Sequence, residues 1–305
     1  FIRTLVAPTG AQVRVLVSGD LHHYARYAGT DRQLVTCGGG GAYLYPTHRL
    51  PEKLEVPPRD TLTRRASNTR EYDLAARYPD KARSRRYGWG IFARLPFRNP
   101  GFTTLLGTLH TLLMLAMAGV AVQRVGTTEQ RLFSVPLAIM LVVAMMGAVF
   151  FAKPPTAGGK RHARHWILGV AHGLAQIALA AGGTWVWLQL PFYDWPWPLP
   201  AVAAAVLYGP VSGLVASQLV ALYLLVAGAF GVNLNELFAA QGIEDSKAFL
   251  RFRIDPDGTL TIYPIAVDKV SHDWQLNPDQ SPTASWLTPK TPLTPRLAEP
   301  PIVIR

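Results

Sequence analysis

Four long runs without a charged side chain occupy the middle of this sequence of 305 residues. At 1.5 Å per residue, about 20 apolar residues make a helix that crosses the roughly 30 Å hydrocarbon core of a bilayer. The runs are residues 102–122, 132–151, 166–190 and 201–232. A buried helix of a soluble protein explains one such run, but four in succession favour membrane spans. We therefore predict a multi-pass α-helical membrane protein with a four-helix transmembrane region at residues 101–232.

Basic residues gather in particular loops, and this predicts the orientation of the chain. There are 30 Lys and Arg against 19 Asp and Glu, a formal net charge of +11. Residues 59–98 hold 11 basic and four acidic side chains, residues 152–165 hold four basic and no acidic ones, and residues 191–200 hold no basic one. Short loops rich in Lys and Arg stay in the cytoplasm. We therefore predict a plasma-membrane protein with both termini cytoplasmic, which contacts the anionic inner leaflet and not nucleic acid.

The sequence outside the spans divides into segments of different composition. These are strands and Gly-rich turns at residues 1–50, a basic juxtamembrane segment at 51–100, a cytoplasmic hairpin segment at 233–276 and a Pro-rich tail at 277–305. Side chains alternate with period two on both sides of the Asp255–Gly258 turn, which predicts a β-hairpin. Because an isolated hairpin is only marginally stable in water, we expect it to dock on the N-terminal domain. The tail is expected to be extended or disordered.

Within the spans, small and polar residues suggest how the helices associate. The pairs at residues 169–173 and 209–213 have the Gly-x-x-x-Gly spacing that lets helix backbones approach closely. We expect them to pack within the bundle, with a dimer seam as the alternative; the sequence does not specify an oligomeric state. His110 and His172 are the readily ionisable side chains of the spans. They are interpreted as hydrogen-bonded structural residues, and a small transporter is the alternative.

The first fifty residues contain the polar cluster that carries chemistry. Residues 13–17 and 33–36 read as strands, and each is followed by a turn that contains glycine. Such turns place polar side chains at one rim of a sheet, where α/β folds tend to build their sites. Asp20 and His22 lie two residues apart in the first turn, so a carboxylate and an imidazole could both reach a divalent Mn, Fe or Zn ion. The single cysteine, Cys37, excludes an internal disulfide and fits a reducing compartment.

The turn resembles a motif of a known family. Residues 19–26 read GDLHHYAR, and this is similar to the last metal motif of calcineurin-like metallophosphoesterases, Gly-His-x-His. The form in purple acid phosphatases, Gly-His-x-His-x-Tyr-Glu-Arg, is the most similar. The two strands, the Gly-rich turn after them and the membrane spans together resemble a bacterial, membrane-anchored subgroup. The resemblance implies that residues 1–50 are the C-terminal part of an α/β metallophosphoesterase sandwich domain.

The resemblance also implies roles for individual residues. His22 matches the second His of Gly-His-x-His and is the expected metal ligand. Asp20 stands where the family has the first His, so it is expected either to bind the metal or to orient a neighbouring group. His23 is the expected catalytic residue, as a phosphate-facing or supporting group.

Three further residues follow from the same comparison. Tyr24 and Arg26 match the Tyr and Arg of the purple acid phosphatase form, where the expected role is structural. His48 could reach the same rim, or it could be a turn residue after Pro46.

The family uses two divalent metal ions to hydrolyse a phosphoester substrate, so two ions are the implied cofactor. A second Asp-x-His, a Gly-Asp-x-x-Asp and a Gly-Asn-His-Asp/Glu do not occur in the sequence. We expect those motifs upstream of Phe1 and expect this fragment alone to be inactive. The predicted function is a membrane-anchored, metal-dependent phosphoester hydrolase. The alternative is a non-enzymatic membrane scaffold or sensor with a degenerate phosphoesterase-like domain, because Asp20 replaces the usual His.

Overall fold

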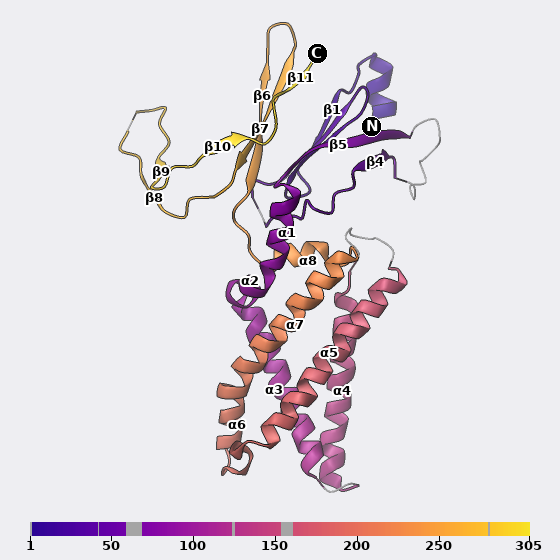
Figure 1. Ribbon diagram of the computed structural model, residues 1–305, viewed down its shortest axis with the longest axis vertical. Coiled ribbons are helices and arrows are strands. Elements are labelled where there is room, and N and C mark those ends of the chain that lie inside the picture. The colour runs from indigo at the N-terminus through magenta and orange to yellow at the C-terminus, as the bar shows by residue number, and fades with distance from the viewer. Residues whose placement is uncertain (1, 42, 59–68, 124–125, 154–160, 280) are drawn as a thin grey trace. The chain divides into compact units, whose positions relative to one another are not determined.

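The structure is a computed structural model that describes residues 2–41, 43–58, 69–123, 126–153, 161–279 and 281–305. It divides into two compact units, which are described separately. The first, called here the strand unit, joins Phe1–Tyr87 to Ile243–Arg305. The second, the helical unit, is Gly88–Gly242. Figure 1 shows strands at both ends of the chain and long helices in its middle.

A five-stranded sheet forms the N-terminal part of the strand unit. Its strands are β1 (Val15–Ser18), β2 (Tyr24–Ala28), β3 (Gln33–Cys37), β4 (Lys53–Val56) and β5 (Arg70–Tyr78). They are ordered β1-β3-β2-β5-β4, with β1 parallel to β3 and the other pairs antiparallel. A π-helical turn (Ile2–Val6) and a 3-10 turn (Ala7–Thr9) precede β1. Because β4 and β5 follow residue 50, the sheet extends into the segment predicted as juxtamembrane.

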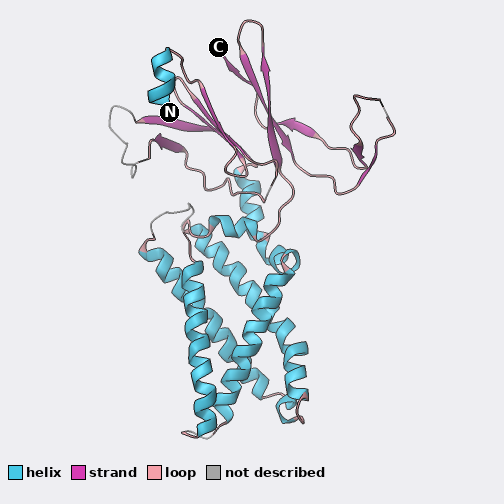
Figure 2. Cartoon of the chain, turned by 180° about the vertical axis from the view of Figure 1, so that it is seen from behind, coloured by secondary structure: helices cyan, strands magenta, loops and turns pink. Residues whose placement is uncertain are grey.

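The predicted hairpin is present in the C-terminal part of the strand unit. It consists of β6 (Lys247–Ile254) and β7 (Leu260–Val267), paired in antiparallel register. Two short strands of the tail, β10 (Pro295–Leu297) and β11 (Ile302–Ile304), pair with the other edge of β7. A separate pair joins β8 (Trp274–Leu276) to β9 (Leu287–Pro289). The end of the tail is therefore extended and hydrogen-bonded, and it is not disordered (Figure 2).

The two sheets share a hydrophobic core. Tyr24, Val35 and Tyr78 of the first sheet pack with Ala248 of β6 and Ala266 of β7, all at most 3% exposed. The prediction that the hairpin docks on the N-terminal segment is confirmed by this cluster. A second cluster is centred on Ala25, Tyr27 and Tyr72 of the same sheet. These residues alternate along their strands with those of the first cluster, so they point to the other face of the sheet.

The helical unit contains the apolar part of the chain. Helix α1 (Lys81–Trp89) runs across the boundary between the units. The helices that follow are α2 (Ile91–Arg98), α3 (Pro100–Val122), α4 (Thr128–Phe151), α5 (Ala163–Leu188), α6 (Leu199–Ala203), α7 (Gly209–Ala229) and α8 (Leu234–Ala239). A π-helical turn (Ala204–Tyr208) joins α6 to α7, and a 3-10 turn (Pro191–Asp194) follows α5.

Four helices in this unit are long and apolar enough to cross a membrane. They are Pro100–Val122, Gln130–Phe151, Ala163–Leu188 and Leu199–Ala229, each within a few residues of a predicted span (Figure 2). Apolar side chains such as Leu132, Val143 and Ile167 are 63% to 69% exposed, as expected where a helix faces lipid and not a protein core. The fourth of these helices ends three residues before the end predicted for the span, and Gly231 then turns the chain with φ 73°.

Glycines bring the helix backbones into close contact. A Cβ on Gly107 of α3 would lie 2.4 Å from the carbonyl oxygen of Gly209, and a Cβ on Gly213 would lie 2.5 Å from a carbonyl oxygen of α3. A Cβ on Gly169 of α5 would lie 2.8 Å from Cα of Val149 on α4, and a Cβ on Gly173 would lie 2.7 Å from the sulfur of Met145. Both predicted Gly-x-x-x-Gly pairs therefore serve packing within the chain.

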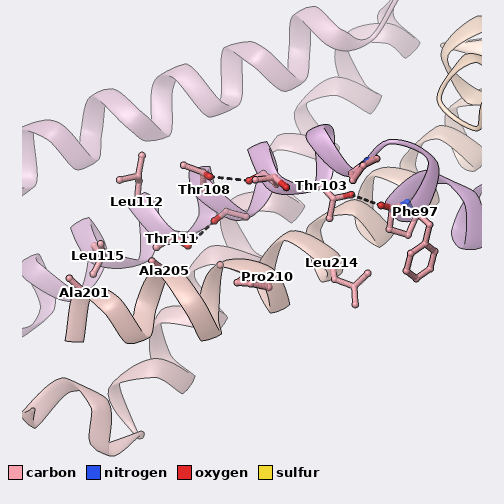
Figure 3. Close-up of a pocket in the computed structure, with 15 residues that line it drawn as sticks. Phe97, Thr103, Thr108, Thr111, Leu112, Leu115, Ala201, Ala205, Pro210 and Leu214 are labelled. Atoms are coloured by element: carbon pink, nitrogen blue, oxygen red, sulfur yellow. Dashed lines mark hydrogen bonds between the residues drawn. The ribbon is translucent and has the colours of Figure 1, made fainter. Parts of the chain in front are cut away.

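An apolar groove runs beside the contact between α3 and α7. It has a volume of about 610 Å³ and is lined by residues such as Leu112, Leu115, Pro210 and Leu214 (Figure 3). Two threonine hydroxyls at its wall donate to carbonyl oxygens of their own helix, Thr111 to Gly107 at 2.8 Å and Thr108 to Thr104 at 3.0 Å. The hydroxyl of Thr103 donates instead to the carbonyl oxygen of Pro96 on α2 at 3.4 Å.

Candidate functional site

The turn between β1 and β2 carries the predicted site residues. Because β1 and β3 are parallel, their carboxyl ends lie at the same rim of the sheet, as the sequence predicted. Gly38, which follows β3, packs directly against this turn. A Cβ at Gly38 would lie 2.3 Å from the carbonyl oxygen of Gly19 and 2.6 Å from that of Leu21. A glycine is therefore required for the Gly-rich segment to support the turn.

His22 is held by the Gly-rich segment on two sides. Its carbonyl oxygen accepts a hydrogen bond from the backbone N–H of Tyr45 at 3.0 Å. Its ring meets the ring of Tyr43 edge to face, with a centroid distance of 4.8 Å. The side chain is half-buried, so its imidazole is both oriented and accessible. This combination suits a metal ligand.

His23 lies in a different environment from its neighbour. It is 1% exposed and stacks on Tyr45 with a centroid distance of 5.6 Å. Burial, with a smaller contribution from the positive charge of His22, lowers the pKa of His23 to about 4, so the ring is neutral at pH 7. Of the two roles expected for His23, this enclosure favours support of the turn over contact with a phosphate.

Asp20 is exposed in the same turn. Across the described residues, no group of three or more His, Cys, Asp or Glu side chains is placed to hold a metal ion. Asp20 and His22 therefore do not make a complete metal site within the part of the chain that the structure describes. Any metal held here needs further ligands.

Tyr24 and Arg26 have the structural role that was expected, and they share a partner that sequence reasoning missed. The Tyr24 hydroxyl donates to Glu299, and Arg26 donates to both carboxylate oxygens of Glu299, at 2.8 Å from Nε and 2.6 Å from Nη2. Burial and the bond to Glu299 raise the pKa of Tyr24. Glu299 lies 273 residues after Arg26, and no local pattern in the tail distinguishes it.

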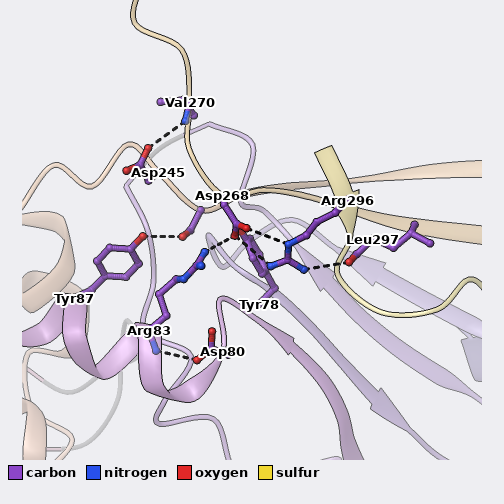
Figure 4. Close-up of polar contacts among 10 residues, drawn as sticks. Tyr78, Asp80, Arg83, Tyr87, Asp245, Asp268, Val270, Arg296 and Leu297 are labelled. Atoms are coloured by element: carbon purple, nitrogen blue, oxygen red, sulfur yellow. Dashed lines mark hydrogen bonds and ion pairs between the residues drawn. The ribbon is translucent and has the colours of Figure 1, made fainter. Parts of the chain in front are cut away.

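A second carboxylate joins the same two parts of the chain (Figure 4). Asp268, directly after β7, accepts hydrogen bonds from Tyr78 at 2.8 Å, from Arg83 of α1 and from Arg296 of β10 at 3.1 Å. Arg296, the other hydrogen-bond donors and the charge of Arg83 hold the pKa of Asp268 well below its usual range. Glu299 and Asp268 thus fix the C-terminal strands on the first sheet.

A hydrogen bond to Ser84 of α1 holds the side chain of His48. The Nδ1 atom of His48 lies 2.8 Å from the Ser84 hydroxyl. Burial first, and then the neighbouring basic side chains, lower the pKa of His48 to about 4. The Ser84 contact favours the interpretation of His48 as a turn residue.

The two histidines of the spans are not isolated. The side chain of Gln176 lies between them, with its Oε1 3.0 Å from Nε2 of His110 and its Nε2 3.1 Å from Nε2 of His172. Gln176 follows His172 by four residues, so helical spacing places both on one face of α5. The sequence therefore carried a signal for this partner.

Comparison of the chain with protein families, with curated proteins and with solved structures found no match.

Proposed function

We propose that the protein is a membrane-anchored, metal-dependent phosphoester hydrolase in which the Gly19–Arg26 turn carries one metal ligand, His22. The observation that carries the proposal is the position of this turn at the joint carboxyl end of two parallel strands. The oriented, half-buried imidazole of His22 supports it. Asp20 is proposed to bind the metal or to orient a neighbouring group. His23 is proposed to support the turn through its buried ring.

The remaining ligands are proposed to come from outside the part of the chain that the structure describes. Hydrolysis by two ions needs them about 3.5–4 Å apart, clamped by several carboxylates and imidazoles. The described residues supply no such group. Accordingly, the isolated chain is expected to be inactive, and activity is expected only in the natural full-length protein with Mn, Fe or Zn.

Turnover of a generic phosphodiester by the full-length protein with added Mn tests this function. His22→Ala is expected to lower turnover by about tenfold or more, because a missing ligand weakens the metal that activates water. His272→Ala is the matched control, since His272 is an exposed histidine that lies in an ion pair with Glu244. Unchanged turnover in His22→Ala would remove His22 from the site.

A second candidate is a membrane scaffold or sensor with a degenerate phosphoesterase-like domain. The exposed carboxylate of Asp20, where the resembling family has a His ligand, favours it. The sequence upstream of Phe1 separates the two candidates. A hydrolase needs the carboxylate-bearing motifs there, whereas a degenerate domain lacks several of them and the wild-type protein then shows no turnover.

We further propose that both ends of the chain lie in the cytoplasm and that the basic segment at residues 51–100 contacts the anionic inner leaflet of the plasma membrane. Exposed basic side chains of α1, including Lys81, Arg85 and Arg86, support this placement at about 1 kcal/mol for each residue near an anionic surface. A green fluorescent protein fused after Arg305 is expected to fluoresce in bacterial cells, because this reporter matures in the cytoplasm. A dark fusion whose membrane insertion is verified would reverse the orientation.

A further inference from the structure

Strand β6 lies at an edge of the C-terminal sheet. It pairs with β7 over its whole length, and no other strand of the described residues pairs with it (Figure 1). The strand is eight residues long, contains no proline and pairs with β7 without a register shift. An open strand edge offers backbone N–H and C=O groups to another strand, and natural proteins usually cover or interrupt such an edge. The outer edge of β6 is therefore a candidate site for strand addition.

Two backbone hydrogen bonds show which residues of β6 face this outer edge. At the turn, the N–H of Asp255 donates to the carbonyl oxygen of Thr259, so the odd-numbered residues of the strand bond to β7. At the other end, the N–H of Ala248 donates to Gly39 at 3.4 Å and not to β7. The even-numbered residues therefore face outward. Beyond Ala248 they are Leu250, Phe252 and Ile254, whose backbone groups have no hydrogen-bond partner among the described residues.

The side chains of the outward-facing residues continue an apolar face beyond the core. Ala248 is buried in the core that the two sheets share, and Leu250 packs against it. Phe252 and Ile254 lie on the same face, because side chains alternate along a strand, and they are 53% and 73% exposed. A strand added at the edge would place every second side chain beside them. Apolar side chains at those positions would remove part of this surface from water.

The other face of β6 is basic. Its side chains are Lys247, Phe249, Arg251 and Arg253. Arg253 forms an ion pair with Asp255 at 2.7 Å, whereas Arg251 has no ion-pair partner among the described residues. Because the backbone of Arg251 bonds inward to β7, the residue opposite it on an added antiparallel strand would form a non-hydrogen-bonded pair, in which side chains are closest. An acidic side chain fits this position.

A second copy of the chain is disfavoured at this edge. Two copies of β6 related by a two-fold axis would pair in antiparallel register around one central residue. In every register centred on a residue from 249 to 253, two basic side chains lie directly opposite each other; Arg251 faces Arg253 when Phe252 is central, for example. Like charges directly opposite destabilise a strand pair. The turn after β6 carries Asp255 and Asp257, which disfavours an anionic lipid surface in the same way.

We propose that the outer edge of β6 binds an extended acidic segment of a partner protein, which adds an antiparallel strand along residues 250–254. The bound strand alternates apolar residues, which lie beside Phe252 and Ile254, with acidic residues, one of which faces Arg251. Main-chain hydrogen bonds supply affinity in this mode of recognition, and the alternating side chains supply specificity. This inference is independent of the proposed hydrolase.

Fluorescence anisotropy with the full 305-residue chain in phosphatidylcholine nanodiscs tests the edge. The probe is a fluorescein-labelled peptide of about eight residues that alternates valine and glutamate. It is expected to bind at pH 7, whereas the matching peptide of valine and lysine is expected to bind about tenfold less well, because its cations face those of β6.

N-methylated peptides separate strand addition from attraction between charges. The valines of the probe lie opposite the outward-facing residues of β6, so their N–H groups donate to the strand, whereas the glutamate N–H groups point away. The probe with N-methylvaline is expected to bind about tenfold less well or worse, because its hydrogen bonds to β6 are lost. The probe with N-methylglutamate is expected to bind as the parent peptide does.

Variants of β6 locate the binding. Arg251→Glu reverses an exposed charge and is expected to exchange the preference, so that the lysine peptide binds about tenfold better than the glutamate peptide. Phe252→Pro is expected to bind the glutamate peptide about fivefold less well than Phe252→Ala. Both variants lack the ring, but only the proline variant lacks an outward-facing N–H, and proline is tolerated at a strand edge.

Equal binding of the glutamate and lysine peptides would overturn the proposal, as would equal binding of the two N-methylated peptides. A wild-type dimer in detergent that Phe252→Pro separates into monomers would assign the edge to a second copy instead. Attachment of the nanodiscs to phosphatidylserine vesicles that Arg251→Glu abolishes would assign this surface to lipid and would equally contradict a protein partner.

Discussion

At the scale of single residues, adjacent side chains of the candidate turn have very different surroundings. His22 is half-buried beside Tyr43, whereas His23 is enclosed and stacked on Tyr45. A sequence shows two consecutive histidines and does not show which one faces inward. The motif resemblance picked His22 as the ligand, and this choice stays a prediction.

The sequence could not predict hydrogen-bond partners that lie far apart along the chain. Glu299 binds Tyr24 and Arg26 across more than 270 residues, and Asp268 binds Tyr78 across 190. Both are ordinary acidic residues in polar surroundings, and only the folded chain brings them to their partners. Gln176 differs, because its spacing from His172 was visible in the sequence.

Cys37 gives a residue-scale prediction about pH. Burial raises the pKa of its thiol from about 9 to about 11, so less thiolate is present in the folded protein at any pH between these values. Alkylation proceeds through the thiolate. The rate of modification by iodoacetamide is therefore expected to keep rising up to about pH 11 in the folded protein, and to level off near pH 9 in the unfolded chain. Because Cys37 is the single cysteine, the reaction is followed by mass spectrometry at the peptide that contains it. A plateau near pH 9 in the folded protein would contradict the placement of the thiol.

At the scale of elements, periodicity and composition predicted which segments form the long helices and the hairpin, but they did not predict how the other strands pair. The four spans and the hairpin follow from local patterns, and the structure has helices and strands at those places. The pairing of β10 and β11 with β7 was not predicted, because both strands have three residues and lie in a Pro-rich tail. The membership of β4 and β5 in the first sheet was missed since basic residues obscured their alternation.

Helix packing gives a prediction at this scale. Gly107→Leu is expected to lower the stability of the helical unit by about 1–3 kcal/mol, because the new Cβ would lie 2.4 Å from the carbonyl oxygen of Gly209. Thermal unfolding in detergent, followed by tryptophan fluorescence, measures this. Gly182→Leu is the control, since nothing lies within 4 Å of a Cβ there. Equal unfolding temperatures for the two variants would contradict the α3–α7 contact.

At the scale of the whole molecule, the segments before and after the long apolar helices form one compact unit. Its two parts are separated in the sequence by four helices that are long and apolar enough to cross a membrane, and an even number of crossings would leave both parts on one side of a bilayer. Residues that follow the last of these helices help to build the candidate turn, since Glu299 and Asp268 hold the sheet that carries it.

A double-mutant cycle between Arg26 and Glu299 tests this central claim most directly. The pair is largely buried, with side chains 18% and 10% exposed, and its two hydrogen bonds are charge-assisted. Unfolding free energies are measured for Arg26→Ala, Glu299→Gln and the double variant. The exposed pair Arg70–Asp31, at 49% and 51% exposed, is the control cycle, with an expected coupling close to zero because water screens the charges.

A coupling of about 1–3 kcal/mol between Arg26 and Glu299 is the expected result. It would establish that the C-terminal tail packs on the sheet that precedes the four long apolar helices. Additive effects of the two substitutions, within about 0.5 kcal/mol, would contradict a single unit built from both ends of the chain.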